Sequence, residues 1–322
     1  MSRYPEFDLT QIASQPISER QSKVRVGDFA RPPTPDRSFS GFLSSLPRIL
    51  AGPQVAEIAD AIVRARRAGR AVVVATGGHV VKTGVAPVLI ALAERGLVSA
   101  FAVNGAVAIH DVEIALFGAT SEDVVHGLRE GTFGMARETA AFLNDAARRA
   151  RDERLGFGET LGMALNASAA PHREASLLAA AGRLGVPLSV HVAIGTDIVH
   201  MHPGADGAAI GDASMRDFRI LARAMEDLAE GGVLLNLGSA VVLPEVILKA
   251  IALLRNRHGE RFTAFLGANL DFVQHYRSNQ QVVSRVREIG GRGIALTGHH
   301  EILVPLLAQA VVETAASDDA PC

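Results

Sequence analysis

The sequence predicts a doubly wound α/β fold, in which a mostly parallel sheet has helices on both faces. Short, nearly continuous apolar runs alternate along the chain with longer stretches whose apolar residues recur at helical spacing. The short runs lack an apolar–polar alternation, which is typical of strands buried on both faces of a parallel sheet. We predict the strands at Ala71–Ala75, Ser99–Val103, Pro187–Val192, Val233–Leu237, Phe262–Leu266 and Ile294–Thr297.

Helical spacing of apolar residues is found before, between and after these runs. It predicts helices at Pro53–Arg67, Ala86–Arg95, Phe133–Arg151, Glu174–Leu184, Met215–Glu230, Pro244–Arg255 and Asn279–Ile289, with an apolar helix after Glu301.

The regular pattern fills residues 46–315, which we predict to form a single catalytic domain. Residues 1–45 carry several prolines among charged and small polar residues, which predicts an irregular N-terminal arm. Two alternatives are open for this arm: a disordered tail, or a segment that packs over a neighbouring subunit. Residues 316–322 are expected to fray.

The composition indicates a compact soluble protein with a large core. Apolar residues make up 48% and charged residues 20% of the 322 residues, and the net charge of −2 gives no reason to expect nucleic acid or an anionic membrane as partner. No apolar run approaches the roughly 20 residues of a membrane span. The N-terminus lacks a signal-peptide pattern, and the single cysteine, Cys322, excludes a disulfide framework. We therefore expect a cytoplasmic protein.

Small and polar residues follow the first predicted strand, as Thr76-Gly77-Gly78-His79. Ligands of open α/β sheets bind beyond the carboxyl ends of the strands. Glycines let the backbone turn sharply there, and the next helix, expected to begin near Thr83–Ala86, would offer its N-terminus to a phosphate. The spacing is not the G-x-G-x-x-G fingerprint, so a tight turn and a cofactor cradle are both open.

The second strand ends in Asn104-Gly105-Ala106, which we interpret as a second lip of the same crevice. His110, Asp111 and Glu113 follow at the start of the next helical turn. Acidic residues at that position are also favoured as helix caps. His110 stands beside an acid, which predicts an acid/base role with Asp111 orienting the ring.

The third strand leads into a loop that contains His191, Asp197, His200 and His202. Their ligand types allow a metal site, although a loop at the rim of the crevice, touching substrate, is the favoured interpretation. Asp197 or Glu113 is expected to hold a substrate cation, and Lys82 is a further candidate.

Similar polar or glycine-containing turns follow the later strands. They predict that the strand ends share one groove. The residues are Gly238 and Ser239 after the fourth strand, Asn269 after the fifth and His299 after the last.

These motifs resemble those of the deoxyhypusine-synthase-like family, which includes deoxyhypusine synthase and archaeal-type ornithine cyclodeaminases. The Gly77–Gly84 and Asn104–Glu113 stretches are similar to the cyclodeaminase branch, and Arg173–Gly195 with Gly232–Ala250 to the synthase branch. The resemblance implies a Rossmann-like sheet that binds NAD, within a homotetramer whose active sites lie at subunit interfaces. It implies that the dinucleotide is lined by Thr76, Gly77, Gly78, His79, Thr83, Asn104, Gly105, Ala106, Gly238, Ser239, Asn269 and His299.

The chain departs from deoxyhypusine synthase in one decisive respect. The segment that would carry the synthase's imine-forming lysine, around Val282–Glu288, has Arg285 and Arg287 but no lysine, and arginine stays protonated. We therefore predict an enzyme that is not a true deoxyhypusine synthase.

The predicted activity is NAD-dependent transient oxidation of a small amine or hydroxy compound, as in a transferase, lyase or oxidoreductase, without a lysine imine. Two alternatives are a metal-dependent hydrolase or lyase built on the histidine loop, and a non-catalytic nucleotide-binding protein. The predicted catalytic residues are His110, Asp111, Glu113, Asp197, His200 and Lys82.

Overall fold

The computed structural model describes residues 3–35 and 38–318 and contains a six-stranded sheet in the order β3-β2-β1-β4-β5-β6. All neighbouring strands run parallel, and this order is the one found in Rossmann folds. The predicted fold class is confirmed. The strands are β1 Val72–Thr76, β2 Ala100–Asn104, β3 Leu188–His191, β4 Val233–Leu237, β5 Leu266–Asp271 and β6 Arg292–Thr297.

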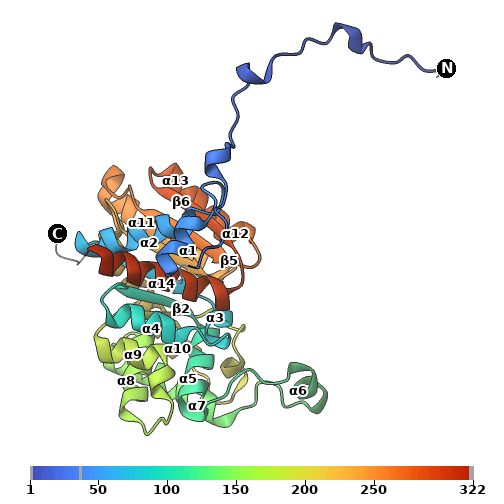
Figure 1. Cartoon of the computed structure of the whole chain (residues 1–322). Coiled ribbons are helices and arrows are strands. Elements are labelled where there is room, and N and C mark those ends of the chain that lie inside the picture. Colours follow the sequence, from blue (N-terminus) through green and yellow to red (C-terminus); the bar gives the residue numbers. More distant parts are fainter. Residues whose placement is uncertain (1–2, 36–37, 319–322) are drawn as a thin grey trace. The chain divides into compact units, whose positions relative to one another are not determined.

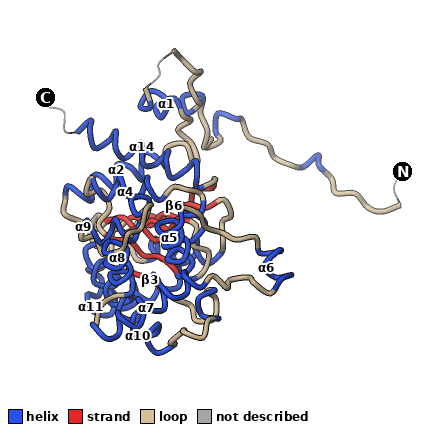
Figure 2. The backbone as a smooth tube through the Cα atoms, turned by 90° about the horizontal axis from the view of Figure 1, so that it is seen from below, coloured by secondary structure: helices blue, strands red, loops and turns tan. Residues whose placement is uncertain are grey.

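Helices surround the sheet, as Figures 1 and 2 show. Those of residues 54–322 are α2 Gln54–Arg67, α3 Gly78–Lys82, α4 Ala86–Glu94, α5 Gly105–Phe117, α6 Val124–Glu130, α7 Arg137–Glu153, α8 Phe157–Ala167, α9 Leu177–Leu184, α10 Gly207–Met225, α11 Val242–His258, α12 Tyr276–Ser278, α13 Arg285–Glu288 and α14 His300–Asp318, with a π-helical segment at Asn279–Ser284. Residues 1–53 contain α1 Phe39–Ser45.

Both faces of the sheet are covered because alternate side chains of a strand point to opposite sides. Val72 and Val74 of β1 face apolar residues of α2, α4 and α14. Val73 and Ala75 belong to the core cluster that includes residues of α10 and α11. A strand that is buried on both faces has no polar alternation, which explains the continuous apolar runs.

The fifth strand lies further along the chain than predicted. The prediction placed it at Phe262–Leu266, whereas β5 begins at Leu266. Phe262 and Phe265 are buried in the core, but they belong to the approach to the strand, where Ala264 has a φ of 56° that an extended strand does not accommodate. The apolar run thus marked burial rather than the strand itself.

Five helices of the domain, α3, α5, α6, α8 and the short α12, were not predicted. α5 is the most important of them, since the predicted helical turn at His110 is in fact the middle of this helix. Its sequence, GAVAIHDVEIALF, has apolar residues around most of the helix, so it shows little helical periodicity. The expected helix start near Thr83–Ala86 is confirmed by α4.

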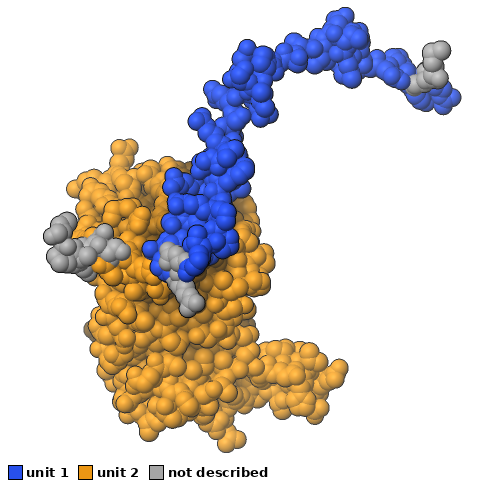
Figure 3. Space-filling model, viewed as in Figure 1, with its two compact units in different colours: residues 1–53 blue, residues 54–322 orange. Residues whose placement is uncertain are grey.

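The chain divides into two compact units, residues 1–53 and 54–322, which Figure 3 colours separately. In the first unit, short 3-10 turns precede α1, and Arg48 N donates to Asp28 O over 2.8 Å. α1 thus lies within the arm predicted to be irregular. In the second unit, α14 continues to Asp318, and the rest of the predicted frayed tail lies outside the described residues. Within the described ranges, every helix is too short or too polar to cross a membrane.

Candidate functional site

Two glycine turns meet at the carboxyl edge of the sheet, where β1 and β4 lie side by side. The chain leaves β1 towards β2 on one side, while β4 pairs with β1 on the other, so this is the topological switch point at which such sheets bind ligands. Gly77 N donates to Leu237 O over 2.9 Å. A Cβ on Gly77 would stand 2.4 Å from Gly238 O. The packing of the two turns therefore requires Gly77, whether or not a cofactor binds.

Four aromatic rings cluster at the same edge: His79, Phe272, His299 and His300. Phe272 stacks on His299, with the ring centroids 5.9 Å apart and the planes 7° from parallel. The His79 centroid lies 5.2 Å from that of Phe272 and 5.4 Å from that of His300. His300 is fully buried, but the other three rings are exposed and offer flat surfaces for stacking.

A cavity of about 640 Å³ lies along α5, the helix that follows β2. Asn104 Oδ1 caps this helix by accepting from Val107 N over 3.1 Å. The lining includes most of the predicted catalytic residues: Lys82, His110, Glu113 and Asp197. The rest of the wall comes from other residues of α5, the loop at 119–122, Val124 of α6, Phe133, the start of α7 and the loop at 196–198.

The cavity and the switch point are neighbours. A Cβ on Gly78, the first residue of α3, would stand 3.1 Å from Ala106 Cβ and 3.3 Å from His110 Cδ2. The turn after β1 therefore packs directly on α5 at the level of His110. A ligand at the switch point would be close to this ring.

A chain of hydrogen bonds crosses the cavity wall. His110 and Glu113 are one turn apart on α5 and share a face. Gly118, with a φ of 70°, ends the helix and turns the chain back, so that Thr120 lies between them. His110 Nδ1 is 2.7 Å from Thr120 Oγ1, which donates to Glu113 Oε2 over 2.5 Å. Thr139 Oγ1 donates to Glu113 Oε1 over 3.1 Å.

His110 is neutral at physiological pH. Burial of the ring, together with the positive charge of Lys82, lowers the pKa of His110 to about 4. A neutral imidazole has one unprotonated nitrogen and can accept a proton from a bound substrate. His110 is therefore in the protonation state that a general base requires.

Asp111 does not orient His110, and that prediction is wrong. Adjacent residues of a helix point in different directions, and the Asp111 carboxylate points to the start of α9. Its oxygens accept from Leu177 N over 2.7 Å, from Leu178 N over 3.0 Å and from Ser176 Oγ over 2.5 Å. Burial raises the pKa of Asp111 to about 6. The residue is a buried cap of α9, and not of its own helix as the capping alternative had it.

Asp197 lies against the N-terminus of α5. A Cβ on Gly105 would stand 1.9 Å from Asp197 Oδ2, so only glycine leaves room for the carboxylate at that position. Negative charge is favoured at a helix N-terminus. His200 Nε2 lies 3.9 Å from the same oxygen, and His200 Nδ1 accepts from Gly195 N over 3.1 Å. Burial raises the pKa of Asp197.

The histidine loop does not converge on a metal site. His191 Nε2 is 2.9 Å from Ser189 Oγ inside β3, whereas His202 Nε2 is 2.8 Å from Gly134 O. Over residues 3–35 and 38–318, no group of three or more His, Cys, Asp or Glu side chains is arranged to hold a metal ion. The alternative built on His191, Asp197, His200 and His202 is therefore not supported.

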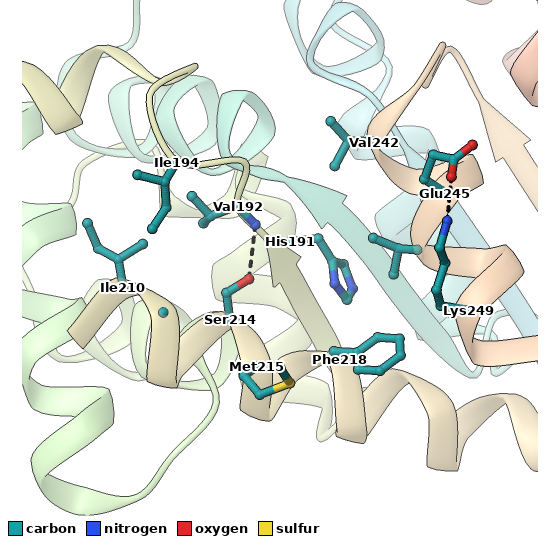
Figure 4. Close-up of a pocket in the computed structure, with 12 residues that line it drawn as sticks. His191, Val192, Ile194, Ile210, Ser214, Met215, Phe218, Val242, Glu245 and Lys249 are labelled. Carbon is teal, nitrogen blue, oxygen red and sulfur yellow. Dashed lines mark hydrogen bonds and ion pairs between the residues drawn. The ribbon is translucent and has the colours of Figure 1, made fainter. Parts of the chain in front are cut away.

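His191 instead borders a second cavity, of about 420 Å³, between α10 and α11 (Figure 4). Most of its lining is apolar, including Phe218 and Met215, and the Glu245–Lys249 ion pair stands at one end. Burial lowers the pKa of His191 to about 3. This groove contains few groups capable of acid/base chemistry, so we do not assign the reaction to it.

Several predicted cofactor residues are used by the fold itself. Thr76 is fully buried, Thr83 Oγ1 donates to Val80 O over 3.0 Å, and Ser239 Oγ accepts from Leu243 N over 3.2 Å. Asn269 lies inside β5, where its Nδ2 donates to Gln274 Oε1 and Asn279 Oδ1.

The expectation that Asn269 lines the groove directly is therefore wrong. The prediction ended the fifth strand at Leu266, so Asn269 was expected in the turn after the strand, whereas β5 extends to Asp271. The side chain is fully buried in the described structure.

Sequence reasoning missed Thr120, Thr139 and Phe272. Thr120 follows the helix-ending Gly118, which is the one local signal that the chain returns towards α5. Thr139 and Phe272 stand in ordinary helical and loop contexts, and only the tertiary structure brings them to Glu113 and His79.

The comparisons with known proteins agree with this fold. A family model for the C-terminal Rossmann fold of ArgZ-like arginine dihydrolases matches residues 56–132, which contain β1, β2 and α5. No curated protein matches the sequence.

Solved structures resemble this chain at low sequence identity. The ternary complex of AgrE with ornithine and NAD⁺ has a TM-score of 0.51 at 16% identity, covering 82% of this chain and 33% of AgrE. ArgZ, an arginine dihydrolase of the ornithine–ammonia cycle in cyanobacteria, gives 0.51 at 18% identity, with 82% and 33% covered. A conserved protein of the LOR/SDH type from Methanococcus maripaludis S2 gives 0.50 at 16% identity, with 81% and 69% covered.

The chain spans about a third of the length of AgrE and ArgZ. At such identities the likeness is one of fold. The motif resemblance is therefore supported for the Rossmann-type fold, and neither branch of the predicted family is singled out.

Proposed function

We propose that this protein is an NAD-dependent enzyme that oxidises a small amine or hydroxy compound, with His110 as the general base. The observation that carries the proposal is the position of His110, in the wall of a 640 Å³ cavity and next to the switch point of a Rossmann sheet. NAD in the ternary complex of AgrE, a protein of similar fold, supports the choice of cofactor.

The groups at the switch point fit a dinucleotide. The exposed rings of His79, Phe272 and His299 provide stacking surfaces for aromatic bases. His300 Nδ1, beside these rings, is buried and has no hydrogen-bond partner in the described part of the chain, which leaves one polar atom at this edge unsatisfied. When bound, the nicotinamide ring supplies a hydride acceptor.

The cavity provides the groups for binding and proton transfer. As hydride leaves a substrate carbon, the adjacent O–H or N–H bond breaks, its proton goes to His110, and the carbon–oxygen or carbon–nitrogen double bond forms. Lys82 and Asp197 both line the cavity and are oppositely charged. Lys82 would attract an anionic part of the substrate, and Asp197 would attract a cationic part. Glu113 is engaged by two threonines, so Asp197 is the better candidate for holding a cation.

Aminobutyl transfer through a lysine imine is not part of this proposal. Val282 and Val286 are buried in the core, and Arg287 Nε donates to Gly293 O over 3.0 Å. Lys249 pairs with Glu245 in the second cavity, whereas Lys82 lies in the first.

We propose further, from the motif resemblance, a cytoplasmic homotetramer with active sites at subunit interfaces.

The test is NAD⁺ reduction by the purified protein with a panel of small amines, amino acids and hydroxy acids. We expect one class to give reduced nicotinamide, and His110→Gln to lower kcat by about a hundredfold or more. Met215→Ala, in the second cavity, is the matched control and should retain the rate. NAD binding with no turnover for any compound would favour the non-catalytic alternative.

A further inference from the structure

We propose that Thr120 is a positioning residue that fixes the tautomer of His110, with the proton on Nδ1 and the lone pair on Nε2. The inference deepens the proposed function, because it specifies which nitrogen of the base is reactive. The tautomer itself is a property of the free protein and is measurable without a substrate.

The direction of the hydrogen bonds carries the proposal. A threonine hydroxyl has a single hydrogen and two lone pairs. Thr120 Oγ1 gives that hydrogen to Glu113 Oε2, over 2.5 Å. The 2.7 Å contact with His110 Nδ1 then requires a hydrogen from the ring, since the hydroxyl has none left to donate. Nδ1 is therefore the protonated nitrogen of the neutral imidazole.

Glu113 holds the Thr120 hydroxyl in this direction. An ionised carboxylate accepts hydrogen bonds and donates none. Its other oxygen accepts from Thr139 Oγ1 over 3.1 Å, and Thr139 is buried at the start of α7. The carboxylate is thus anchored between α5 and α7, so the Thr120 hydroxyl has a fixed acceptor.

The ring edge that carries Nε2 lies beside the turn after β1, next to the proposed dinucleotide site. Cδ2, the ring atom bonded to Nε2, is 3.3 Å from the position of a Cβ on Gly78, at the turn after β1. Within the part of the chain that the structure describes, Nε2 makes no hydrogen bond. Proton transfer from a substrate O–H or N–H to Nε2 would leave an imidazolium, whose Nδ1–H still donates to Thr120 and, through it, reaches Glu113.

Other charged groups border the same cavity: Lys82 on α3, Glu122 before α6, Glu138 on α7 and Asp197 in the loop after β3. Of these, Lys82 lowers the pKa of His110. Each contacts the common space, but the Nδ1 contact is with Thr120.

The direct test is a long-range ¹H–¹⁵N NMR spectrum of the full chain with ¹⁵N-labelled histidine at neutral pH. His110→Gln identifies the signals of His110. We expect Nε2 at the downfield position of an unprotonated nitrogen and Nδ1 at the upfield position of an N–H nitrogen. The reverse pattern in the folded wild-type protein would overturn the proposal.

Variants at Thr120 extend the test. Thr120→Val removes the acceptor for Nδ1–H, so the His110 signals should move towards the Nε2–H tautomer, while Thr120→Ser keeps the hydroxyl and the original pattern. Thr196→Val is the matched control, because Thr196 lines the same cavity but its hydroxyl donates to Ala193 O and not to the His110–Thr120–Glu113 network. Unchanged signals in Thr120→Val, or an equal change in both valine variants, would contradict a specific role of Thr120.

Activity gives an independent readout once a substrate is known. Thr120→Val should lower kcat by about ten- to a hundredfold with little change in KM, and Thr120→Ser should restore most of it. Failure of NAD binding would remove the proposed function but leave the NMR result standing. If His110 carries its proton on Nε2 and NAD-dependent turnover is intact, only the proposed role of Thr120 is contradicted.

Discussion

The charge state of His110 depends on its surroundings. Burial disfavours the imidazolium, and the nearby ammonium of Lys82 disfavours it further, so the pKa falls to about 4. A base with this pKa stays unprotonated over the whole physiological range. The cost is a weaker driving force for accepting a proton, which a bound anionic group near Lys82 would offset.

Removing the charge of Lys82 should raise the pKa of His110. In Lys82→Met the Coulombic contribution disappears while burial of the ring remains, so we expect an upward shift that stays below the ordinary value of 6.5. An NMR titration of the His110 ring measures it. Lys249→Met, which removes a lysine from the second cavity, should leave this titration unchanged. No shift in Lys82→Met would show that Lys82 does not act on His110.

Residue types alone could predict part of the site. The sequence places His110 and Glu113 one helical turn apart after a strand, and both line the cavity. It did not separate them from Asp111, because the prediction began the helical turn at His110, where an acid at position 111 was expected to lie beside the ring. With α5 beginning at Gly105, Asp111 faces α9 and His110 faces Thr120.

At the scale of elements, buried carboxylates join helices and strands that are distant in the sequence. Asp111 of α5 caps α9. Asp217 of α10 accepts from Gly158 N of α8 over 2.9 Å and from Val190 N of β3 over 2.6 Å. Each carboxylate satisfies backbone donors that would otherwise be buried without partners.

Loss of the Asp111 carboxylate should destabilise the protein strongly. Asp111→Ala leaves two backbone amides and the Ser176 hydroxyl buried without this acceptor, and we expect a loss of about 3 kcal/mol or more in the free energy of unfolding. Asp123→Ala is the matched control: it removes an exposed cap of α6 and should cost about 1 kcal/mol. Equal losses in chemical denaturation would contradict the special role of Asp111.

The elements differ in how well the sequence predicts them. β1, β2 and β4 were placed within a residue because their apolar runs coincide with hydrogen-bonded strands. β5 was misplaced because it carries buried polar residues, Asn269 and Asp271, whose partners come from other segments. Burial of polar groups depends on tertiary hydrogen bonds, which have no local pattern.

At the scale of the whole molecule, the buried carboxylates should make stability depend on pH. Burial raises the pKa of Asp217 to about 7 and that of Asp111 to about 6, from 3.8. Between about pH 4 and pH 6 for Asp111, and between about pH 4 and pH 7 for Asp217, the unfolded chain has released the proton while the folded state retains it. Their contribution to the free energy of unfolding therefore falls as pH rises, by about 1.4 kcal/mol per pH unit for each group.

Asp217→Asn removes one of these titrations and should flatten that dependence. The amide oxygen can still accept from Gly158 N and Val190 N, so the fold is retained. Urea unfolding of wild type and variant at several pH values measures the difference. The stability of the variant relative to wild type should rise from pH 4 to pH 7, and a constant or falling difference would contradict a raised pKa for Asp217.

The overall arrangement follows from the strand order. Because β1 and β4 are neighbours, the turns that follow them meet, and the helix after β2 brings His110 to the same place. The sequence predicted that polar strand ends would share one edge, and the parallel sheet has that property. It did not reveal that the turns at Gly77 and Gly238 pack closely against each other. The exposed groups for a ligand at this edge are the rings of His79, Phe272 and His299.

Calorimetric titration of the purified full chain with NAD⁺ tests the central claim most directly. We expect saturable binding that weakens in His79→Ala and Phe272→Ala, which remove exposed rings at the switch point, and that is unchanged in Met215→Ala in the second cavity. The absence of binding to the folded wild-type protein, or equal binding by all three variants, would contradict a dinucleotide site at this edge of the sheet.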